Sequence, residues 1–322
     1  MKKNIVSLVV ILVVVVGVVF AAGRSAKEET VQTDRLVVAT SFYPLYYFAS
    51  QIAGEHAEVV NLGQNSDPHD FTPSAADIVT LQGADLVLLQ GAGLESWGED
   101  AEHQLGDAGV PVFVVAEHIS LHRIEEDELD LAHEGEGADQ EPGVEDGHVD
   151  GEFDPHTWLD PVLAAETVTR IAEELASIDP AHEDTYLANA RILSDELVQL
   201  DVAYRTSFTT CTADEVLVSH DAFGYIARRY NLTMHPIAGI STQDEPSAAL
   251  LAKLKEEAQE GVLAILTEEN SVKEYAETLS RETGVSLLSV STLEAGGTAG
   301  GDYMDGMRAN LEILKQGYGC TE

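Results

Sequence analysis

Three histidines and one glutamate stand in short, distinctive local sequences in both halves of this 322-residue chain. They are His69 in Asp67-Pro68-His69-Asp70, His156 in Asp154-Pro155-His156-Thr157, His220 in Ser219-His220-Asp221 and Glu294 in Thr292-Leu293-Glu294. Three imidazoles and one carboxylate are a ligand set that Zn²⁺ accepts in a tetrahedral site. A single histidine near the end of a strand is more often structural. A metal site therefore requires that the four positions converge on one cleft.

The elements around these residues predict an α/β fold with two similar lobes, because short apolar β-rich runs alternate with helical stretches in both halves. The predicted strands are 36–41, 58–62, 85–90 and 112–116, then 216–219, 233–237, 262–267 and 286–290. The predicted helices are 73–82, 95–108, 161–178, 246–260, 271–284 and 302–315. Each lobe is expected to be a parallel sheet flanked by helices. Ligands of such sheets bind beyond the carboxyl ends of the strands, where His220 and Glu294 are expected.

One long helix is predicted to join the lobes, beginning at Asp179 and Pro180. Its apolar residues recur at spacings of four and three, which is typical of a narrow buried seam. They are Tyr186, Ala190, Leu193, Leu197, Leu200 and Tyr204. We interpret this helix as a rigid strut across both lobes; a helix that covers a single domain is the alternative. The expected division is an N-terminal lobe at 35–178, a connecting helix at 179–208 and a C-terminal lobe at 209–322.

The N-terminus indicates export. Lys2 and Lys3 precede an apolar run from Ile5 to Ala22, so residues 1–23 are predicted to be a signal peptide. The run also reaches the length of a membrane span, so an uncleaved anchor is the alternative. The polar residues 24–34 are expected to be a linker. In either case the folded part is expected to lie outside the cytoplasm, in the periplasm or at the cell surface.

The charge balance excludes a nucleic-acid partner. The chain has 57 acidic and 17 basic residues and a formal net charge of −40, whereas phosphate binding needs clustered lysine and arginine. Cations are the expected ligands, although solubility or adaptation to a salty medium explains the same charge.

The two cysteines, Cys211 and Cys320, are predicted to form a disulfide that ties the C-terminus to the second lobe. This prediction depends on their places, one just before a predicted strand and one just after the last predicted helix. Two free thiols are the alternative, and a catalytic cysteine is disfavoured.

An acidic segment at 117–154 interrupts the pattern and carries His118, His122, His133 and His148. It has few apolar residues to offset its ordering entropy, so it is predicted to be largely disordered. It is either a solvated loop or an auxiliary, low-affinity metal collector.

Five ordered blocks between about Leu36 and Gly319 resemble the solute-binding proteins of zinc and manganese ABC importers, the ZnuA type with its AdcA and TroA relatives. The blocks are Pro68-His69-Asp70-Phe71, Gly91-Ala92-Gly93-Leu94-Glu95-Ser96-Trp97, Asp154-Pro155-His156-Thr157-Trp158-Leu159, Ser219-His220-Asp221-Ala222-Phe223-Gly224-Tyr225 and Asp302-Tyr303-Met304 with Met307-Arg308-Ala309-Asn310-Leu311. The resemblance implies a receptor that holds one metal ion between two lobes and passes it to a membrane permease. We expect a monomer, and the acidic segment resembles the charged loop of zinc-type members.

The resemblance also implies ligand roles. His69, His156 and His220 match the family's three successive ligand positions, and the third is histidine in zinc-type and glutamate in manganese-type members. The implied metal is therefore Zn²⁺, with Mn²⁺ as the alternative. Because the rings must be neutral to bind metal, affinity is expected to fall as the pH drops through about 6.5.

The fourth ligand is expected to be Glu294, since Thr292-Leu293-Glu294 fits a motif of some zinc-type members. Glu268, Glu269 or a water molecule are the alternatives. Asp70 and Asp221 are candidates to orient the imidazoles by accepting from their second nitrogen.

Two rival functions follow from the same residues. An exported zinc hydrolase would need a metal with an open coordination position, and the sequence has no His-Glu-x-x-His helix. An adhesin or extracellular scaffold would use a structural metal and would unfold on chelation.

Overall fold

The computed structural model describes residues 35–124, 153–240, 246–268, 273–296 and 301–321. Contacts group Leu36–Glu322 into one compact unit. Among the described residues, no helix is both long and apolar enough to cross a membrane. The predicted signal at 1–23 and linker at 24–34 lie outside the described residues.

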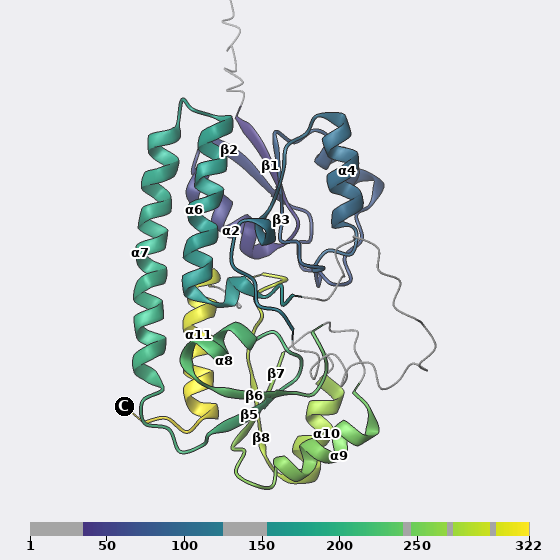
Figure 1. Ribbon diagram of the computed structural model, residues 1–322, viewed down its shortest axis with the longest axis vertical. Helices are drawn as coiled ribbons and strands as arrows, with labels where there is room; N and C mark the ends of the chain where they lie inside the picture. The colour runs from purple at the N-terminus through teal and green to yellow at the C-terminus, as the bar shows by residue number, and fades with distance from the viewer. Residues whose placement is uncertain (1–34, 125–152, 241–245, 269–272, 297–300, 322) are drawn as a thin grey trace, which may run out of the picture. The chain divides into compact units, whose positions relative to one another are not determined.

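The first half forms one parallel sheet in the order β2-β1-β3-β4 (Figure 1). Its strands are β1 (Leu36–Thr40), β2 (Ala57–Asn61), β3 (Leu86–Leu89) and β4 (Val112–Val114), and its helices are α2 (Tyr43–Ala53), α3 (Ala75–Gln82) and α4 (Gly98–Ala108). Side chains of β3 alternate between the two faces. Leu86 and Leu88 join the core that includes α2, while Val87 and Leu89 join the core beneath α3 and α4. Burial on both faces explains why β3 is continuously apolar.

The second half repeats this arrangement with the strand order β6-β5-β7-β8. Its strands are β5 (Glu215–Val218), β6 (Thr233–Pro236), β7 (Ala264–Thr267) and β8 (Ser286–Ser289), and its helices are α8 (Gly224–Tyr230), α9 (Ala248–Glu257), α10 (Lys273–Thr283) and α11 (Tyr303–Gly317). The prediction of two similar lobes, each a parallel sheet flanked by helices, is confirmed.

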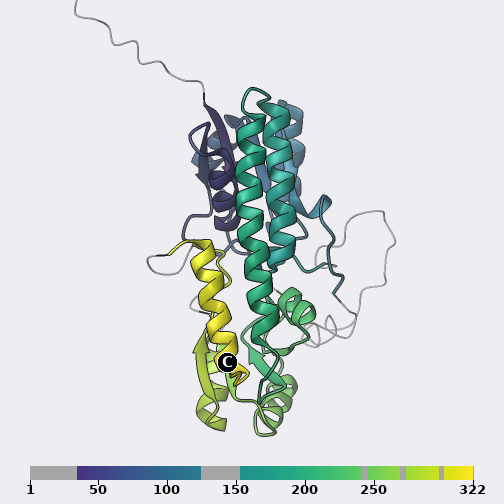
Figure 2. The same cartoon turned by 90° about the vertical axis from the view of Figure 1, so that its left-hand side faces the viewer.

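A hairpin of two helices, α6 (Pro161–Ile178) and α7 (Glu183–Ser207), connects the sheets (Figure 2). Helix α7 packs on α6 and α2 and also on α11, so it spans both halves. The residues of the predicted seam are its buried residues. The helix begins at Glu183, after the predicted Pro180, because the preceding residues form a turn in which the ring of His182 lies 2.6 Å from Asp179 Oδ2.

Two helices were not expected from the sequence pattern, α2 and α8. Helix α3 also begins later than predicted, at Ala75. Its N-terminus is fixed by a capping box in which Ser74 and Asp77 exchange hydrogen bonds.

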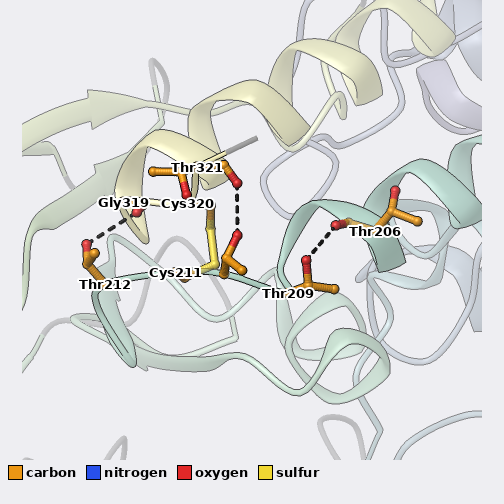
Figure 3. Close-up of a disulfide and its surroundings, with 8 residues drawn as sticks. Thr206, Thr209, Cys211, Thr212, Gly319, Cys320 and Thr321 are labelled. Atoms are coloured by element: carbon orange, nitrogen blue, oxygen red, sulfur yellow. Dashed lines mark hydrogen bonds between the residues drawn. A yellow bond between two sulfur atoms is a disulfide. The ribbon is translucent and has the colours of Figure 1, made fainter.

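The predicted disulfide is confirmed: Cys211 is bonded to Cys320 (Figure 3). Thr212 Oγ1 donates a hydrogen bond to the carbonyl of Gly319 over 3.2 Å beside it. The segment after α11 is thereby joined to the segment that leads into β5.

Candidate metal centre

The structure brings the four candidate residues together, although they come from different elements. His69 lies between β2 and α3, and His156 immediately precedes a 3₁₀ turn at Thr157–Leu159. His220 follows β5, and Glu294 lies between β8 and α11. One potential ligand atom from each residue falls within 4.8 Å of all the others. Segments that follow strands of both sheets thus bring candidate ligands to one point. Ligand sites of such folds are expected beyond the carboxyl ends of the strands.

The separations match those between ligands of a small tetrahedral ion. Nε2 of His69 and Nε2 of His156 are 3.4 Å apart, and Glu294 Oε1 lies 3.5 Å from His156 Nε2 and 3.9 Å from His69 Nε2. Zn–N bonds of about 2.0–2.1 Å in a tetrahedron place ligand atoms roughly 3.3 Å apart. The donor atoms therefore lie close to the positions that a zinc ion requires.

The centre is buried, and three of its polar atoms lack a hydrogen-bond partner among the described residues. His156 and His220 are fully buried, and Glu294 is 5% exposed. These atoms are Nδ1 and Nε2 of His220 and Oε1 of Glu294. Leaving such atoms unpaired is unfavourable, and a bound cation would remove that cost for one nitrogen of His220 and for Glu294 Oε1.

Repeated Asp-Pro-His sequences shape the backbone at two of the ligands. Asp67 Oδ1 accepts a hydrogen bond from the backbone N–H of His69 over 3.0 Å. Asp154 Oδ1 accepts the equivalent bond from His156 over 2.9 Å. Each aspartate thus closes a local turn that directs the following histidine. This role of Asp67 and Asp154 was not predicted from the sequence, although the repeated Asp-Pro-His is a signal that could have indicated it.

Carboxylates also contact the second nitrogen of two rings. Asp154 Oδ1 lies 2.8 Å from His156 Nδ1, and Glu268 Oε1 lies 2.8 Å from His220 Nδ1. At His220 this partner is Glu268 and not the expected Asp221. The orienting role of Asp70 stays a prediction. Glu268 was also an alternative fourth ligand, but it faces the nitrogen of His220 that points away from the centre. Glu269 lies outside the described residues.

Burial and neighbouring charges shift the pKa values of the candidate ligands in different directions. Burial lowers the pKa of His69 to about 3, against the attraction of Glu294. Burial also disfavours the charged form of His156, but Asp154 and Glu294 outweigh it and raise its pKa to about 10. Burial opposes ionisation of Glu294, but the histidines lower its pKa to about 2. The pKa of His220 is also raised, because Glu268 outweighs its burial. The centre therefore combines an ionised carboxylate with two rings whose pKa lies above the ordinary value.

His118 and His122 of the acidic segment are not part of this group. The ring of His118 stacks on Phe113 with centroids 4.3 Å apart, and the backbone N–H of His122 donates to the Tyr225 hydroxyl over 2.9 Å. Residues 117–124 and 153–154 therefore hold defined positions, and the predicted disorder does not extend to them. His133 and His148 lie outside the described residues.

Comparison with known proteins identifies relatives over almost the whole chain. The sequence profile of the ZnuA family, described as zinc-uptake complex component A, periplasmic, matches residues 38–317. The high-affinity zinc uptake system protein ZnuA of Bacillus subtilis (strain 168) is 37% identical over 305 residues, which cover 92% of each chain.

Solved structures agree with the fold. The Zn(II)-bound ZnuA-like domain of AdcA from Streptococcus pneumoniae has a TM-score of 0.70 at 32% identity, over 88% of this chain and 99% of that one. The laminin binding protein Lmb of Streptococcus agalactiae, described as bifunctional with adhesin and metal transporting activity, has a TM-score of 0.75 at 31% identity, again over 88% and 99%.

Proposed function

Because this chain belongs to the ZnuA family of zinc-uptake components, we propose that it is an extracytoplasmic receptor that binds one Zn²⁺ ion tightly and delivers it to the permease of an ABC importer. The observation that carries this proposal is the buried group of His69, His156, His220 and Glu294. Their donor atoms converge from both sheets on one point, and no other group of the described residues has this composition and spacing.

The donor set favours zinc over manganese. Three imidazoles and one carboxylate suit Zn²⁺, whereas Mn²⁺ prefers oxygen-rich surroundings. Four protein ligands also complete a tetrahedral shell, so no coordination position is left for a reactive water. This argues against the hydrolase alternative and for a site that only captures and releases the ion.

A purely structural metal is also disfavoured. One apolar core runs through α2, α6, α7 and α11 and includes residues of both sheets. The fold therefore has a large source of stability apart from the metal, and chelation is expected to leave it folded. Adhesion, the second activity named for the Streptococcus agalactiae relative, stays an alternative that the metal centre does not address.

Location and partners follow from the family and the sequence. The apolar run near Ile5–Ala22 is proposed to export the chain and either to be removed or to anchor it. The folded part is proposed to act as a monomer that presents its metal to the permease. Its formal net charge of −40 is consistent with an approach by cations.

Competitive metal titration tests this function. The metal-free protein should bind one equivalent of Zn²⁺ more tightly than Mn²⁺, and its far-ultraviolet circular dichroism should not change on chelation. His220→Glu should shift the preference toward manganese. Tighter binding of manganese by the unaltered protein, or unfolding on chelation, would contradict the proposal.

A further inference from the structure

The turn that carries Glu294 has an unusual backbone at Leu293. The φ angle of Leu293 is 62°, in the left-handed region that residues other than glycine and asparagine rarely adopt. Such a conformation persists only where the surroundings hold it, and it is concentrated at functional sites. Leu293 directly precedes the candidate ligand, so whatever holds Leu293 also directs Glu294.

The first turns of α11 hold this backbone from one side. A Cβ atom added at Gly306 would lie 2.3 Å from Leu293 Cδ2 and 3.4 Å from Cγ, so the leucine occupies the space that a side chain at Gly306 would take. One helical turn later, Asn310 Oδ1 accepts from Ser291 N over 2.9 Å and Asn310 Nδ2 donates to Ser291 O over 2.6 Å. Helix α11 therefore binds both the start and the middle of the turn.

Residues outside α11 hold the other side of the turn. The indole N–H of Trp158 donates to the carbonyl of Thr292 over 2.7 Å, and Tyr43 N donates to the carbonyl of Glu294 over 3.3 Å. Thr292 Oγ1 donates to Glu294 Oε2 over 2.9 Å. These bonds occupy Oε2 and the backbone and leave Oε1 directed at the histidines, 3.5 Å from His156 Nε2.

We propose that Gly306 is a positioning residue of the metal centre: the missing side chain seats Leu293, and Leu293 sets the turn that aims Glu294 at the ion. This inference rests on the proposed function, since it concerns the ligand role of Glu294. The packing around Leu293 opposes a rotation that would make room for a methyl group at Gly306, because Leu293 is 1% exposed and lies in the core. The displacement passes to the backbone of the turn and moves the carboxylate.

Gly306→Ala tests the proposal, with Gly317→Ala as its matched control. Both glycines are buried in α11, but a Cβ at Gly317 would meet only ordinary contacts of 3.4 Å or more. Gly306→Ala should weaken Zn²⁺ binding roughly 10–100-fold, as expected for a residue that supports a ligand, and Gly317→Ala should not. The visible spectrum of the Co²⁺-loaded protein should lose the intensity typical of tetrahedral coordination only in Gly306→Ala.

A double-mutant cycle identifies Leu293 as the intermediary. Leu293→Ala removes the clashing atoms, so Leu293→Ala/Gly306→Ala should bind Zn²⁺ no more weakly than Leu293→Ala alone. If Gly306→Ala does not fold, Leu293→Ala, which adds no atoms, carries the test and should itself weaken binding.

The outcomes separate this inference from the proposed function. Glu294→Ala must weaken Zn²⁺ binding if Glu294 is a ligand, and an unchanged affinity there would reject the metal centre itself. If Glu294→Ala weakens binding while Gly306→Ala and Leu293→Ala lower only the melting temperature, Gly306 has a packing role alone and the inference is overturned.

Discussion

Glu268 Oε1 lies 2.8 Å from His220 Nδ1, and both residues are buried, at 5% and 0% exposure. The hydroxyl of Ser219 donates to the same carboxylate oxygen over 3.3 Å. A carboxylate in this position fixes the orientation of the imidazole and makes its other nitrogen a better metal ligand. We infer that His220 presents Nε2 to the centre and that Glu268 would support a bound metal through His220.

Glu268→Gln should consequently weaken Zn²⁺ binding roughly 10–100-fold while the protein stays folded. The amide keeps the size of the side chain but removes the charge that holds the ring. Glu215→Gln is a matched control, because Glu215 Oε2 lies 2.9 Å from His235 Nε2 at a partly exposed position outside the centre. Competition with a coloured chelator measures both. Equal affinities in the two variants would refute the role of Glu268.

Zn²⁺ affinity should rise with pH through the neutral range. The pKa of His156 is raised to about 10, so the ring holds a proton below that pH and must release it to bind metal. His220, whose pKa is also raised, adds to this competition, whereas His69, whose pKa is lowered to about 3, does not. Affinity should therefore increase about tenfold per pH unit between about pH 6.5 and pH 8.5, and calorimetry in buffers of different ionisation enthalpy should detect at least one released proton.

Asp154→Asn is the control for this dependence. Asp154 is one of the groups that raise the pKa of His156, so its neutralisation should lower that pKa and flatten the pH profile. An affinity that does not vary with pH in the unaltered protein would contradict the protonated state of His156.

Gln90 should be needed for full metal affinity without touching the metal. Its Nε2 donates to the carbonyl of Pro155 and to Thr157 Oγ1, each over 3.0 Å, on either side of His156. Gln90→Leu should weaken Zn²⁺ binding roughly tenfold or more. Asn189→Leu removes a comparable bond to the carbonyl of Ile52, 3.0 Å long and outside the centre, and should lower stability alone. Equal effects of Gln90→Leu and Asn189→Leu on Zn²⁺ affinity would contradict this supporting role of Gln90.

Removing the disulfide should lower stability and leave metal binding intact. Cys211 and Cys320 are 109 residues apart, and a bond that closes such a long loop typically stabilises a protein by roughly 2–5 kcal/mol. The bond lies beyond the C-terminal end of α11, whereas Glu294 precedes the N-terminal end. Urea unfolding of Cys211→Ser/Cys320→Ser measures the loss. A large change in Zn²⁺ affinity with unchanged stability would contradict the prediction that the disulfide supports stability and not metal binding.

The sequence predicted the sheets and the connecting helix because their signals are local. Continuous apolar runs identify strands buried on both faces, and the seam from Tyr186 to Tyr204 repeats over the whole of α7. Helix α2 escaped prediction because most of its residues are buried, which removes the polar face that marks helical periodicity. Helix α8 has only seven residues.

The candidate site was predictable in its four main residues and not in their supports. The local motifs around the histidines carry the resemblance, but the contact between His220 and Glu268 joins residues far apart in the sequence. No spacing rule distinguishes a carboxylate that faces the metal from one that faces the outer nitrogen of a ligand. The contact between Leu293 and Gly306 likewise depends on how α11 packs against the turn. Only the folded structure shows this packing.

A crystal structure of the protein grown with Zn²⁺, with the ion located by its anomalous scattering, tests the central claim most directly. We predict a single ion bound by Nε2 of His69, His156 and His220 and by the carboxylate of Glu294, at about 2.0–2.2 Å from each. An ion bound elsewhere, or one that leaves any of these four side chains outside its coordination shell, would contradict the account.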